Sequence, residues 1–343
     1  MTPFAESDAP VAVLGAGNWG TTLAHLVAAN GRPAILWTRD REQRDEINSL
    51  STNQRAVPGL SLSPRVRAVT ELADAIHDTP LVVIAVPSQS FREVCRQLGE
   101  HIGPEQLVIH ATKGLERTTH SRMTQILLEE TCARQLGVLA GPNIAAEIAQ
   151  GKPAGTVIVS RFPRVVDAGK AALSSHSFMV FSGDDVVGVE LAGAFKNIVA
   201  IASGIASEMD VGENAKAFLV ARGLAEMSKL GMAMGASALT FSGLAGVGDL
   251  VVTCASPDSR NHRVGVALAR GERLPDILER LGMVAEGVHA AVSAHELIAK
   301  HGVDAPLLEH VYRILYEGVS PQYSLHELMG LPAGRDVGRR LHS

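Results

Sequence analysis

The sequence predicts an α/β fold, in which a doubly wound, mostly parallel sheet is followed by an all-helical C-terminal part. Short β-branched runs alternate with helical stretches from Val11 to about Phe181, which is typical of repeated β-α units. Beyond Asp184 no strand series is evident, and long stretches rich in Ala, Leu, Val and Met predict helices. We therefore expect two domains, residues 1–185 and residues 186–343.

The expected strands are short, and each leads into a turn or a helical stretch. Leu81–Val86 is hydrophobic throughout, as a strand covered on both faces should be. The expected strands are Val11–Leu14, Ala34–Trp37, Leu81–Val86, Leu107–Ile109, Val138–Ala140, Thr156–Val159 and Phe178–Phe181. The clearest expected helices are Thr21–Ala29, Phe91–Leu98, Val186–Ser207, Glu213–Gly231, Asn261–Arg270, Gly287–Lys300 and Leu307–Tyr316.

The composition excludes several classes of protein. Apolar residues make up 46% and charged residues 20% of the 343 residues, which is ordinary for a globular chain and argues against disorder. Lys and Arg total 31 against 36 Asp and Glu, and the net charge of −5 argues against a broad nucleic-acid surface. Aromatic residues make up 4% and glycines number 33, so we expect an aliphatic core with close backbone approaches.

The N-terminus and the cysteines indicate a compartment. Residues 1–10 lack the basic and apolar segments of a signal peptide, and we expect no apolar run long enough to span a bilayer. Cys95, Cys132 and Cys254 are too widely spaced for a disulfide framework or a zinc cluster, so we expect buried free thiols and no metal. These features predict a soluble, cytoplasmic protein without an integral membrane segment.

A glycine-rich turn follows the first expected strand. The segment Gly15-Ala16-Gly17-Asn18-Trp19-Gly20 has the pattern G-x-G-x-x-G in a strand–turn–helix setting. The first glycine permits the tight turn, the second lets the backbone approach a pyrophosphate, and the third lets helix and strand pack closely. Free N–H groups at the helix start suit the phosphates. Gly15, Gly17 and Gly20 therefore predict a Rossmann-type dinucleotide-binding domain rather than a purely structural turn.

The end of the second strand leaves the type of dinucleotide open. A carboxylate at this place binds the adenosine ribose of NAD, whereas a nearby arginine accommodates the 2′-phosphate of NADP. The chain has Thr38-Arg39-Asp40 here, so Arg39 favours NADP while Asp40 is compatible with NAD.

Three polar stretches interrupt the apolar C-terminal part. Lys196 lies among small residues on its helix, so it either projects into a ligand cleft or is a snorkelling surface lysine. Asp249 follows a glycine-rich stretch and is either a site carboxylate or a helix N-cap. Ser259, Arg260 and Asn261 stand where a helix begins, which suits a phosphate or carboxylate, or simply a capped helix.

Two further segments follow strands of the expected sheet. Lys113 comes after Leu107–Ile109, and Gly141-Pro142-Asn143 comes after Val138–Ala140. Both segments therefore lie at carboxyl ends of strands, where open α/β sheets bind their ligands.

Taken in order, these segments make the chain resemble the bacterial NAD(P)-dependent glycerol-3-phosphate dehydrogenase family, from Val11 to about Glu327. The resemblance rests on Gly15–Gly20, Ala111–Glu116, Gly141-Pro142, Phe195-Lys196-Asn197, Gly248-Asp249-Leu250, Ser259-Arg260-Asn261 and Val284–Gly287. It implies hydride transfer that interconverts dihydroxyacetone phosphate and sn-glycerol 3-phosphate. It also implies the family's role, which is to supply glycerol 3-phosphate for phospholipid synthesis.

The resemblance also implies roles for individual residues, with Lys196 as the proton acceptor in the direction of oxidation. Substrate contacts are implied for Lys113, Gly141, Asn143, Lys196, Asp249, Ser259, Arg260 and Asn261. Nucleotide contacts are implied for Asn18, Trp19, Arg39, Lys113, Ala145, Arg260, Val284 and Glu286. The corresponding expectation is a homodimer that binds NAD or NADP and a small phosphorylated substrate, without a metal.

A few positions depart from the family pattern. Asn143 stands where Ser or Thr is usual, His262 stands where Arg is common, and Asp40 replaces a basic or small residue. These departures leave the reaction class intact and bear on nucleotide preference and substrate affinity.

A free lysine is a poor base near neutral pH, because its pKa is about 10.4. Burial and a second cation would lower the pKa of Lys196, and Lys113 is the plausible second cation, while Asp249 would orient the ammonium. In the direction of reduction, the Lys196 ammonium donates its proton without needing any pKa shift.

Three alternatives to this function remain open from the residues themselves. Another dehydrogenase with a Rossmann domain and a helical domain, of the 3-hydroxyacid or ketopantoate type, can also use a catalytic lysine, although Ser259–Asn261 favours a phosphate. A non-catalytic NAD(P)-sensing regulator would not need Lys196, Asp249 and Arg260 together. A structural protein with a relict nucleotide fold would show no turnover.

Overall fold

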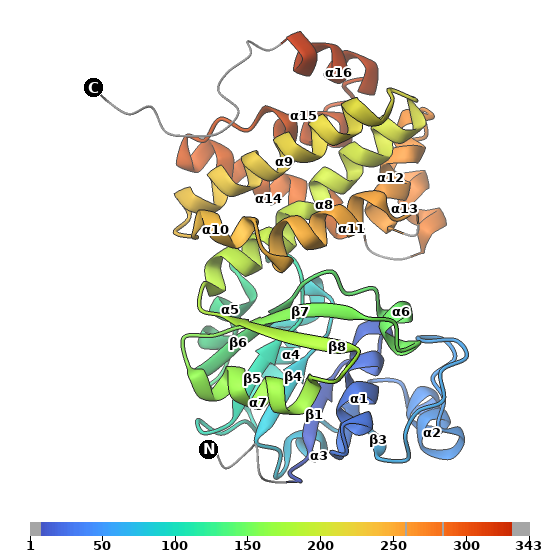
Figure 1. Ribbon diagram of the computed structural model, residues 1–343, viewed down its shortest axis with the longest axis vertical. Helices are drawn as coiled ribbons and strands as arrows, with labels where there is room; N and C mark the ends of the chain where they lie inside the picture. The colour runs from blue at the N-terminus through green and yellow to red at the C-terminus, as the bar shows by residue number, and fades with distance from the viewer. Residues whose placement is uncertain (1–7, 258, 283–284, 331–343) are drawn as a thin grey trace.

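The computed structural model describes residues 8–257, 259–282 and 285–330. The chain forms a lower half built on a sheet and an upper half built of helices, and α8 leads from one into the other (Figure 1). The sheet has eight strands in the spatial order β3-β2-β1-β4-β5-β6-β7-β8. The strands are β1 (Val11–Leu14), β2 (Ala34–Trp37), β3 (Val66–Val69), β4 (Leu81–Ile84), β5 (Leu107–His110), β6 (Gln135–Ala140), β7 (Ala154–Val159) and β8 (Phe178–Gly183).

Strands β1 to β6 are parallel, and their order is the doubly wound order of dinucleotide-binding sheets. The expected mostly parallel sheet is therefore confirmed. β7 pairs antiparallel with β6 and parallel with β8, so the last two strands run in the opposite direction. β3 is absent from the expected strands, because it is a four-residue edge strand whose apolar pattern is interrupted by the exposed Arg67.

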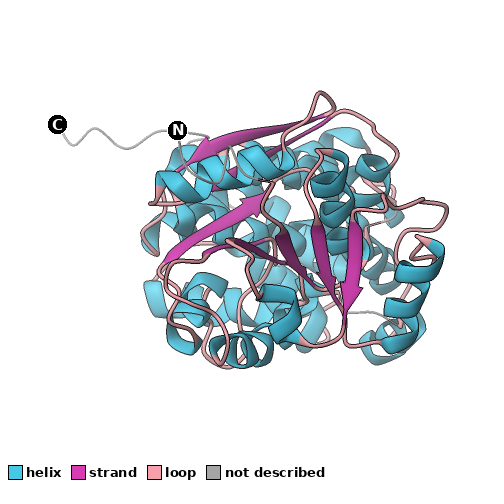
Figure 2. Ribbon diagram, turned by 90° about the horizontal axis from the view of Figure 1, so that it is seen from below, coloured by secondary structure: helices cyan, strands magenta, loops and turns pink. Residues whose placement is uncertain are grey.

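Helices cover both faces of the sheet, as Figure 2 shows. Val11 and Val13 of β1 pack with residues of α1 and α7, whereas Ala12 and Leu14 pack with residues of α3, α4 and α5. Alternate side chains of one strand therefore enter two separate apolar layers. The helices of this half are α1 (Asn18–Ala29), α2 (Arg41–Leu50), α3 (Leu72–Ile76), α4 (Ser88–Gly99), α5 (Met123–Glu130), α6 (Ala145–Ala149) and α7 (Pro163–Leu173).

The second half packs around α8. Gly204 on α8 and Gly265 on α12 allow close packing, because a Cβ at either position would lie 2.0 Å from a carbonyl oxygen of the other helix. The backbones of α8 and α12 are therefore in contact. The elements are α8 (Val186–Glu208), α9 (Glu213–Ala233), α10 (Ala238–Phe241), the π-helical turn η1 (Leu244–Gly248), α11 (Asp249–Ala255), α12 (Arg260–Ala269), α13 (Leu274–Leu281), α14 (Glu286–His301), α15 (Pro306–Tyr316) and α16 (Pro321–Gly330).

A buried carboxylate fixes α8 to the sheet half. Glu190, near the start of α8, accepts hydrogen bonds from Arg122 Nη1 (2.5 Å), from the N–H of Thr124 (2.8 Å) and from Thr124 Oγ1 (2.7 Å). His110 Nε2, at the end of β5, lies 3.2 Å from Glu190 Oε1. Burial by itself would raise the pKa of Glu190, but His110 and Arg122 outweigh it and lower the pKa. The junction between the halves therefore holds an ionised, fully hydrogen-bonded side chain.

Two expectations about surface and burial need correction. Cys95 and Cys254 are buried, but Cys132 is exposed in the loop between α5 and β6.

α8 and the stretch Ala238–Ala255 are, by length and apolar composition, long enough to cross a membrane, which the sequence analysis did not expect. However, 89% of the apolar window of α8 is buried in the protein, as in the core helix of a globular fold. The window in Ala238–Ala255 is 33% buried, and length and composition alone are weak evidence for a membrane segment.

Glu226 on α9 is a buried carboxyl that supports the start of another helix. Its Oε2 accepts a hydrogen bond from the backbone N–H of Leu308, in the first turn of α15, at 3.1 Å. Burial raises the pKa of Glu226 to about 7, although the N–H groups of Leu308 and Leu307 oppose the rise. Between pH 4.5 and pH 7 the folded protein therefore keeps a proton that the unfolded chain releases, so stability decreases as pH rises through this window.

Glu226→Gln keeps the shape and the acceptor but removes the ionisation. At pH 8 we expect the variant to be more stable than the wild-type protein by up to about 3 kcal/mol, and near pH 4.5 we expect no difference. Urea unfolding followed by circular dichroism at both pH values measures this. Glu213→Gln, at an exposed position on the same helix, is the control. Equal stability of wild type and Glu226→Gln at pH 8 would contradict the assignment.

Candidate active site

The glycine turn has the geometry that its spacing predicts. Gly15 has a φ of +110°, and a Cβ there would lie 2.6 Å from the Ala85 carbonyl oxygen. A Cβ on Gly20 would lie 1.8 Å from the Gly15 carbonyl oxygen, so the helix start and the turn are in contact. A Cβ on Gly17 would meet no atom within 4 Å, so the backbone there faces open space. The tight turn and the close packing are confirmed, and the pyrophosphate contact stays a prediction.

The buried side-chain amides of Gln43 and Asn53 are hydrogen-bonded to the backbone of the glycine turn. Gln43 Nε2 donates to the Ala16 carbonyl oxygen (2.9 Å) and to Asn53 Oδ1 (3.0 Å). Asn53 Nδ2 donates to the same carbonyl (3.1 Å) and to Thr21 Oγ1 (2.8 Å). The hydroxyl of Thr38, at the end of β2, donates to Gln43 Oε1 at 2.6 Å. Sequence analysis does not find Gln43 and Asn53, because a single amide carries no motif.

The end of β2 presents an arginine rather than a carboxylate. Asp40 caps α2, because its Oδ1 accepts from two N–H groups of the first turn at 3.0 and 3.2 Å. Its Oδ2 lies 3.0 Å from Arg55 Nη2. Arg39 is exposed, and its guanidinium carbon lies 5.6 Å from the centroid of the Trp37 ring. Both oxygens of Asp40 therefore have partners, whereas the exposed Arg39 side chain lies over the Trp37 ring at the end of β2.

Three expected nucleotide contacts lie around the start of α1. Asn18 is the first residue of α1 and is exposed. Trp19 packs edge-on against Phe178, with the ring centroids 6.4 Å apart. Ala145 begins α6, and its carbonyl oxygen accepts a hydrogen bond from Thr22 Oγ1 at 3.4 Å. α6 therefore lies against the N-terminal part of α1.

Lys113, Asp249 and Lys196 meet where the two halves of the chain join. Asp249 Oδ1 accepts from Lys196 Nζ at 2.7 Å, and Asp249 Oδ2 accepts from Lys113 Nζ at 2.6 Å. Lys113 also donates to the Gly141 carbonyl oxygen at 3.3 Å. Lys196 is only 4% exposed, so it is not a snorkelling lysine. Asp249 is not an N-cap, because Gly248 occupies that position of α11.

The charged groups in this cluster shift one another's pKa values. Burial lowers the pKa of Lys196 to about 8, with Asp249 opposing the shift and Lys113 adding to it. Burial by itself would raise the pKa of Asp249, but the two ammonium groups outweigh it and hold the pKa below its ordinary value. The expected lowering by burial and a second cation is confirmed. Near pH 8, Lys196 therefore exchanges a proton readily while Asp249 stays ionised.

Thr253 is a member of the cluster that sequence analysis misses. Lys196 Nζ donates to Thr253 Oγ1 at 2.5 Å, and this hydroxyl donates to the Asp249 carbonyl oxygen at 2.6 Å. Two oxygens from successive turns of α11 therefore orient the ammonium. The available signal was the spacing of Asp249 and Thr253, four residues apart on one helix face.

Gly141 and Asn143 lie on the sheet side of the cluster. Gly141 has a φ of +147°, and a Cβ there would lie 3.1 Å from Thr156 Cα. Asn143 Nδ2 donates to Thr156 Oγ1 at 3.0 Å. Asn143 Oδ1 is buried and has no hydrogen-bond partner among the described residues. This oxygen is therefore an acceptor for a donor group on a ligand.

The start of α12 combines a cap with a bridge between helices. Ser259 is the N-cap, and its Oγ accepts from the N–H of His262 at 3.4 Å. Asn261 is buried, donates from Nδ2 to Asn197 Oδ1 (2.9 Å) and accepts at Oδ1 from the N–H of Gly287 (2.9 Å). The capped-helix interpretation therefore holds for Ser259, and Asn261 ties α8, α12 and α14 together. Direct substrate contact by these residues stays a prediction.

Glu286 begins α14 and lies close to the start of α12. Ser88 Oγ donates to Glu286 Oε2 at 2.7 Å. Burial raises the pKa of Glu286, while Ser88 and the charge of Arg260 oppose the rise. Of the expected nucleotide contacts, Val284 lies outside the described residues.

The glycine turn, Glu286 and the lysine cluster form a continuous wall along the junction of the two halves. Gly15 contacts Ala85 and Val86 after β4, and Ser88 contacts Glu286. A Cβ on Gly114, next to Lys113, would lie within 3.4 Å of both Ser88 and Glu286. The glycine turn, Glu286 and the lysine cluster therefore follow one another along the carboxyl edge of β1, β4 and β5, where the strand order reverses.

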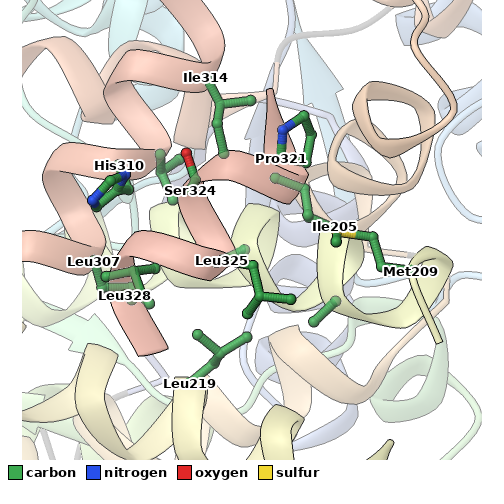
Figure 3. Close-up of a pocket in the computed structure, with 13 residues that line it drawn as sticks. Ile205, Met209, Leu219, Leu307, His310, Ile314, Pro321, Ser324, Leu325 and Leu328 are labelled. Carbon is green, nitrogen blue, oxygen red and sulfur yellow. The ribbon is translucent and has the colours of Figure 1, made fainter. Parts of the chain in front are cut away.

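Two cavities lie away from this wall. The pocket in Figure 3 lies between α8, α9, α15 and α16, is lined mainly by apolar side chains and has a volume of about 30 Å³. That volume holds water-sized molecules only. A larger cavity of about 370 Å³ lies between β7, β8, the start of α8, α10 and η1. Neither cavity is lined by Lys113, Lys196 or Asp249.

A Rossmann-type sheet joined to a helical half at a buried lysine–carboxylate–lysine cluster defines the class of protein, a nicotinamide-dependent oxidoreductase. Residues 10–165 match the family described as NAD-dependent glycerol-3-phosphate dehydrogenase N-terminus, and residues 185–326 match the corresponding C-terminus. The chain therefore belongs to the NAD-dependent glycerol-3-phosphate dehydrogenase family. The expected family is confirmed.

Individual relatives agree along almost the whole chain. Glycerol-3-phosphate dehydrogenase (NAD(P)+) of Acinetobacter baylyi is 44% identical over 311 residues, which is 91% of this chain and 87% of that protein. The enzyme of the same name from an Exiguobacterium species is 41% identical over 337 residues, 97% of this chain and 99% of that protein.

Solved structures agree with the fold. Glycerol-3-phosphate dehydrogenase from Coxiella burnetii superimposes with a TM-score of 0.90 at 34% identity, covering 96% of this chain and 100% of that one. A ketopantoate reductase from Ralstonia eutropha reaches a TM-score of 0.57 at 17% identity, covering 93% of this chain and 99% of that one. At this low identity the second likeness shows a shared fold alone.

Gly17→Ala and Gly20→Ala separate the two functions of the turn. Gly17→Ala adds a methyl group in open space at the expected pyrophosphate, so we expect nearly unchanged thermal stability and at least a tenfold loss of NADPH affinity, about 1.4 kcal/mol. Gly20→Ala forces the helix away from the turn, so we expect a clear drop in Tm.

Calorimetry and fluorescence titration with NADPH measure the two effects. Gly103→Ala, in the loop between α4 and β5 where a Cβ meets only Gln106 Oε1 at 3.7 Å, is the control. Unchanged NADPH affinity in Gly17→Ala would show that the turn does not hold the pyrophosphate.

Proposed function

We propose that this protein catalyses the NAD(P)-dependent interconversion of dihydroxyacetone phosphate and sn-glycerol 3-phosphate. The single observation that carries the proposal is the buried Lys196, held by Asp249 and Thr253 beside the nucleotide wall. When bound, the nicotinamide supplies or accepts the hydride at substrate C2. Lys196 donates a proton to the C2 oxygen during reduction as an ammonium, and accepts it during oxidation as an amine.

The residues around Lys196 support a phosphorylated substrate. Lys113 and Arg260 supply positive charge, and the start of α12 presents backbone N–H groups that suit an anion. On this proposal, Ser259, Arg260 and Asn261 hold the phosphate end of the substrate. The unpaired Asn143 Oδ1, beside Gly141, accepts a hydrogen bond from a substrate hydroxyl. A short keto acid has no phosphate group for the backbone N–H groups at the start of α12 to bind.

In this proposal each half of the chain has its own role. We assign residues 1–185 to nucleotide binding, through Gly15, Gly17, Gly20 and the contacts around α1, and residues 186–343 to the substrate and the proton transfer. Asn18, Trp19, Arg39, Lys113, Ala145, Arg260, Val284 and Glu286 are the proposed nucleotide contacts. We further propose a cytoplasmic homodimer that supplies glycerol 3-phosphate for phospholipid synthesis.

Lys196→Ala is expected to abolish turnover of dihydroxyacetone phosphate, because the proton donor is lost. NADPH binding should survive, because the proposed nucleotide contacts are unchanged. In the wild-type protein, kcat/KM for reduction should fall as pH rises through about 8, and that for oxidation should rise. Asp249→Asn removes the charge that raises the Lys196 pKa. The fall of kcat/KM for reduction should therefore occur at lower pH than in the wild-type protein.

Steady-state assays in both directions, with titration of NADPH, measure these changes. Lys229→Ala on α9, a lysine that is 42% exposed, is the matched control. A normal rate in Lys196→Ala would refute its assignment, and reduction of ketopantoate in preference to dihydroxyacetone phosphate would refute the substrate.

The geometry at the end of β2 predicts a preference for NADPH over NADH. Asp40 is engaged by the start of α2 and by Arg55, so it does not accept from the ribose hydroxyls, whereas the exposed Arg39 suits a 2′-phosphate. Arg39→Ala should lower kcat/KM for NADPH at least about tenfold and change that for NADH little.

The two nucleotides are compared in the same assay at saturating substrate. Arg65→Ala, at the opposite end of β3 from the carboxyl edge of the sheet, is the control. A wild-type preference for NADH would show that Asp40 leaves its capping position when the nucleotide binds.

A further inference from the structure

Ser88 and Glu286 join the two halves at the nucleotide end of the wall. Ser88 is the first residue of α4, directly after β4, and is 6% exposed. Glu286 is the first residue of α14 in the helical half and is half-buried. The Ser88 hydroxyl donates to Glu286 Oε2 at 2.7 Å, a short bond typical of a hydroxyl that donates to a carboxylate.

The surroundings place this bond on the path of the nucleotide. β1 and β4 are neighbours at the point where the strand order reverses, and Gly15 contacts the loop Ala85–Pro87 that leads into Ser88. On the other side, Gly114 follows Lys113 directly. A Cβ on Gly114 would lie 3.0 Å from Ser88 Cβ and 3.4 Å from Glu286 Oε2. Glu286 therefore lies between the glycine turn and the lysine cluster, where a dinucleotide runs from pyrophosphate to nicotinamide.

We propose that Ser88 is a positioning residue that aims the Glu286 carboxylate at the hydrogen-bond donors of the nicotinamide half, its ribose hydroxyls and its carboxamide. The inference rests on the proposed function and adds a residue to its nucleotide site. A glutamate at the start of a helix is flexible, and Arg260 attracts it from the start of α12. The hydrogen bond from Ser88 holds the carboxylate in one direction and joins α4 of the sheet half to α14 of the helical half.

The same contacts act on the pKa of Glu286. Burial raises the pKa of Glu286, and the hydrogen bond from Ser88 opposes the rise together with Arg260. In its ionised form Glu286 is an acceptor only, so it accepts from Ser88 and from the hydrogen-bond donors of the nucleotide. Loss of the Ser88 hydroxyl removes one of the two Ser88 hydrogen bonds that orient the carboxylate, and with it one of the influences that oppose the rise in the pKa of Glu286.

Ser88→Ala tests the proposal, with Ser90→Ala as the matched control. Ser90 lies two residues further along α4, and its hydroxyl donates to the Pro87 carbonyl oxygen at 3.2 Å, away from Glu286. Fluorescence titration with NADPH alone should give a Kd about tenfold higher in Ser88→Ala, as expected for one charge-assisted hydrogen bond. At saturating NADPH, kcat and the KM for dihydroxyacetone phosphate should stay close to wild type. Ser88→Thr, which keeps the hydroxyl, should restore part of the affinity.

A thermodynamic cycle separates positioning from general support. If Ser88 acts through Glu286, Ser88→Ala should weaken NADPH binding in the wild-type background and add nothing in Glu286→Ala. Fully additive losses would overturn the proposal even when Ser88→Ala is less stable. An NADPH affinity in Ser88→Ala equal to that of Ser90→Ala would overturn it too, as would a loss confined to kcat. The titration needs no substrate, so a wild-type protein that binds NADPH but does not reduce dihydroxyacetone phosphate refutes the proposed function alone.

Discussion

One buried carboxylate between two ammonium groups sets the arrangement of the whole molecule. Asp249 accepts from Lys196 of the central helix and from Lys113 of the sheet half, so a single side chain connects three segments from both halves. A lysine as buried as Lys196 is costly without a partner, and two ammonium groups without Asp249 would repel each other. The halves therefore have to meet at this point. The cluster keeps a net charge of about +1, which suits an anionic substrate.

The central helix places its lysine in the interior because it is built of small residues. Gly204 and Gly265 bring α8 and α12 into backbone contact, and Gly287 leaves no room for a Cβ beside the Asn197 carbonyl oxygen. Asn261 then satisfies both Asn197 and the start of α14. The scarcity of aromatic residues and the abundance of glycine thus serve one purpose, which is to draw the starts of two helices close to Lys196.

The fold was largely predictable from the sequence because it depends on local patterns. Alternating apolar runs locate the strands, and the glycine spacing locates the turn, since each signal lies within about six residues. The reversed direction of β7 and β8 was not predictable, because it depends on pairing partners rather than on composition. Resemblance brought Lys113, Asp249 and Lys196 together as candidates, but only the structure decides between a snorkelling lysine and a buried one. Thr253, Gln43, Asn53 and Ser88 belong to no motif, because each acts through hydrogen bonds to residues that the fold brings next to it from elsewhere in the sequence.

On the proposed function, the carboxylate that Lys113 and Lys196 share also couples substrate binding to proton transfer. Asp249 alone would raise the pKa of Lys196, but Lys113 occupies its second oxygen and offsets that effect, so burial prevails. On the proposed function, a phosphorylated substrate brings negative charge toward Lys113 and the start of α12. That charge reduces the influence of Lys113 on Lys196 and raises the pKa of Lys196 again. The ammonium form is therefore favoured when dihydroxyacetone phosphate occupies the site, which is the form that its reduction requires. On the proposed function, Lys113 thus contributes both to substrate binding and to the protonation state of Lys196.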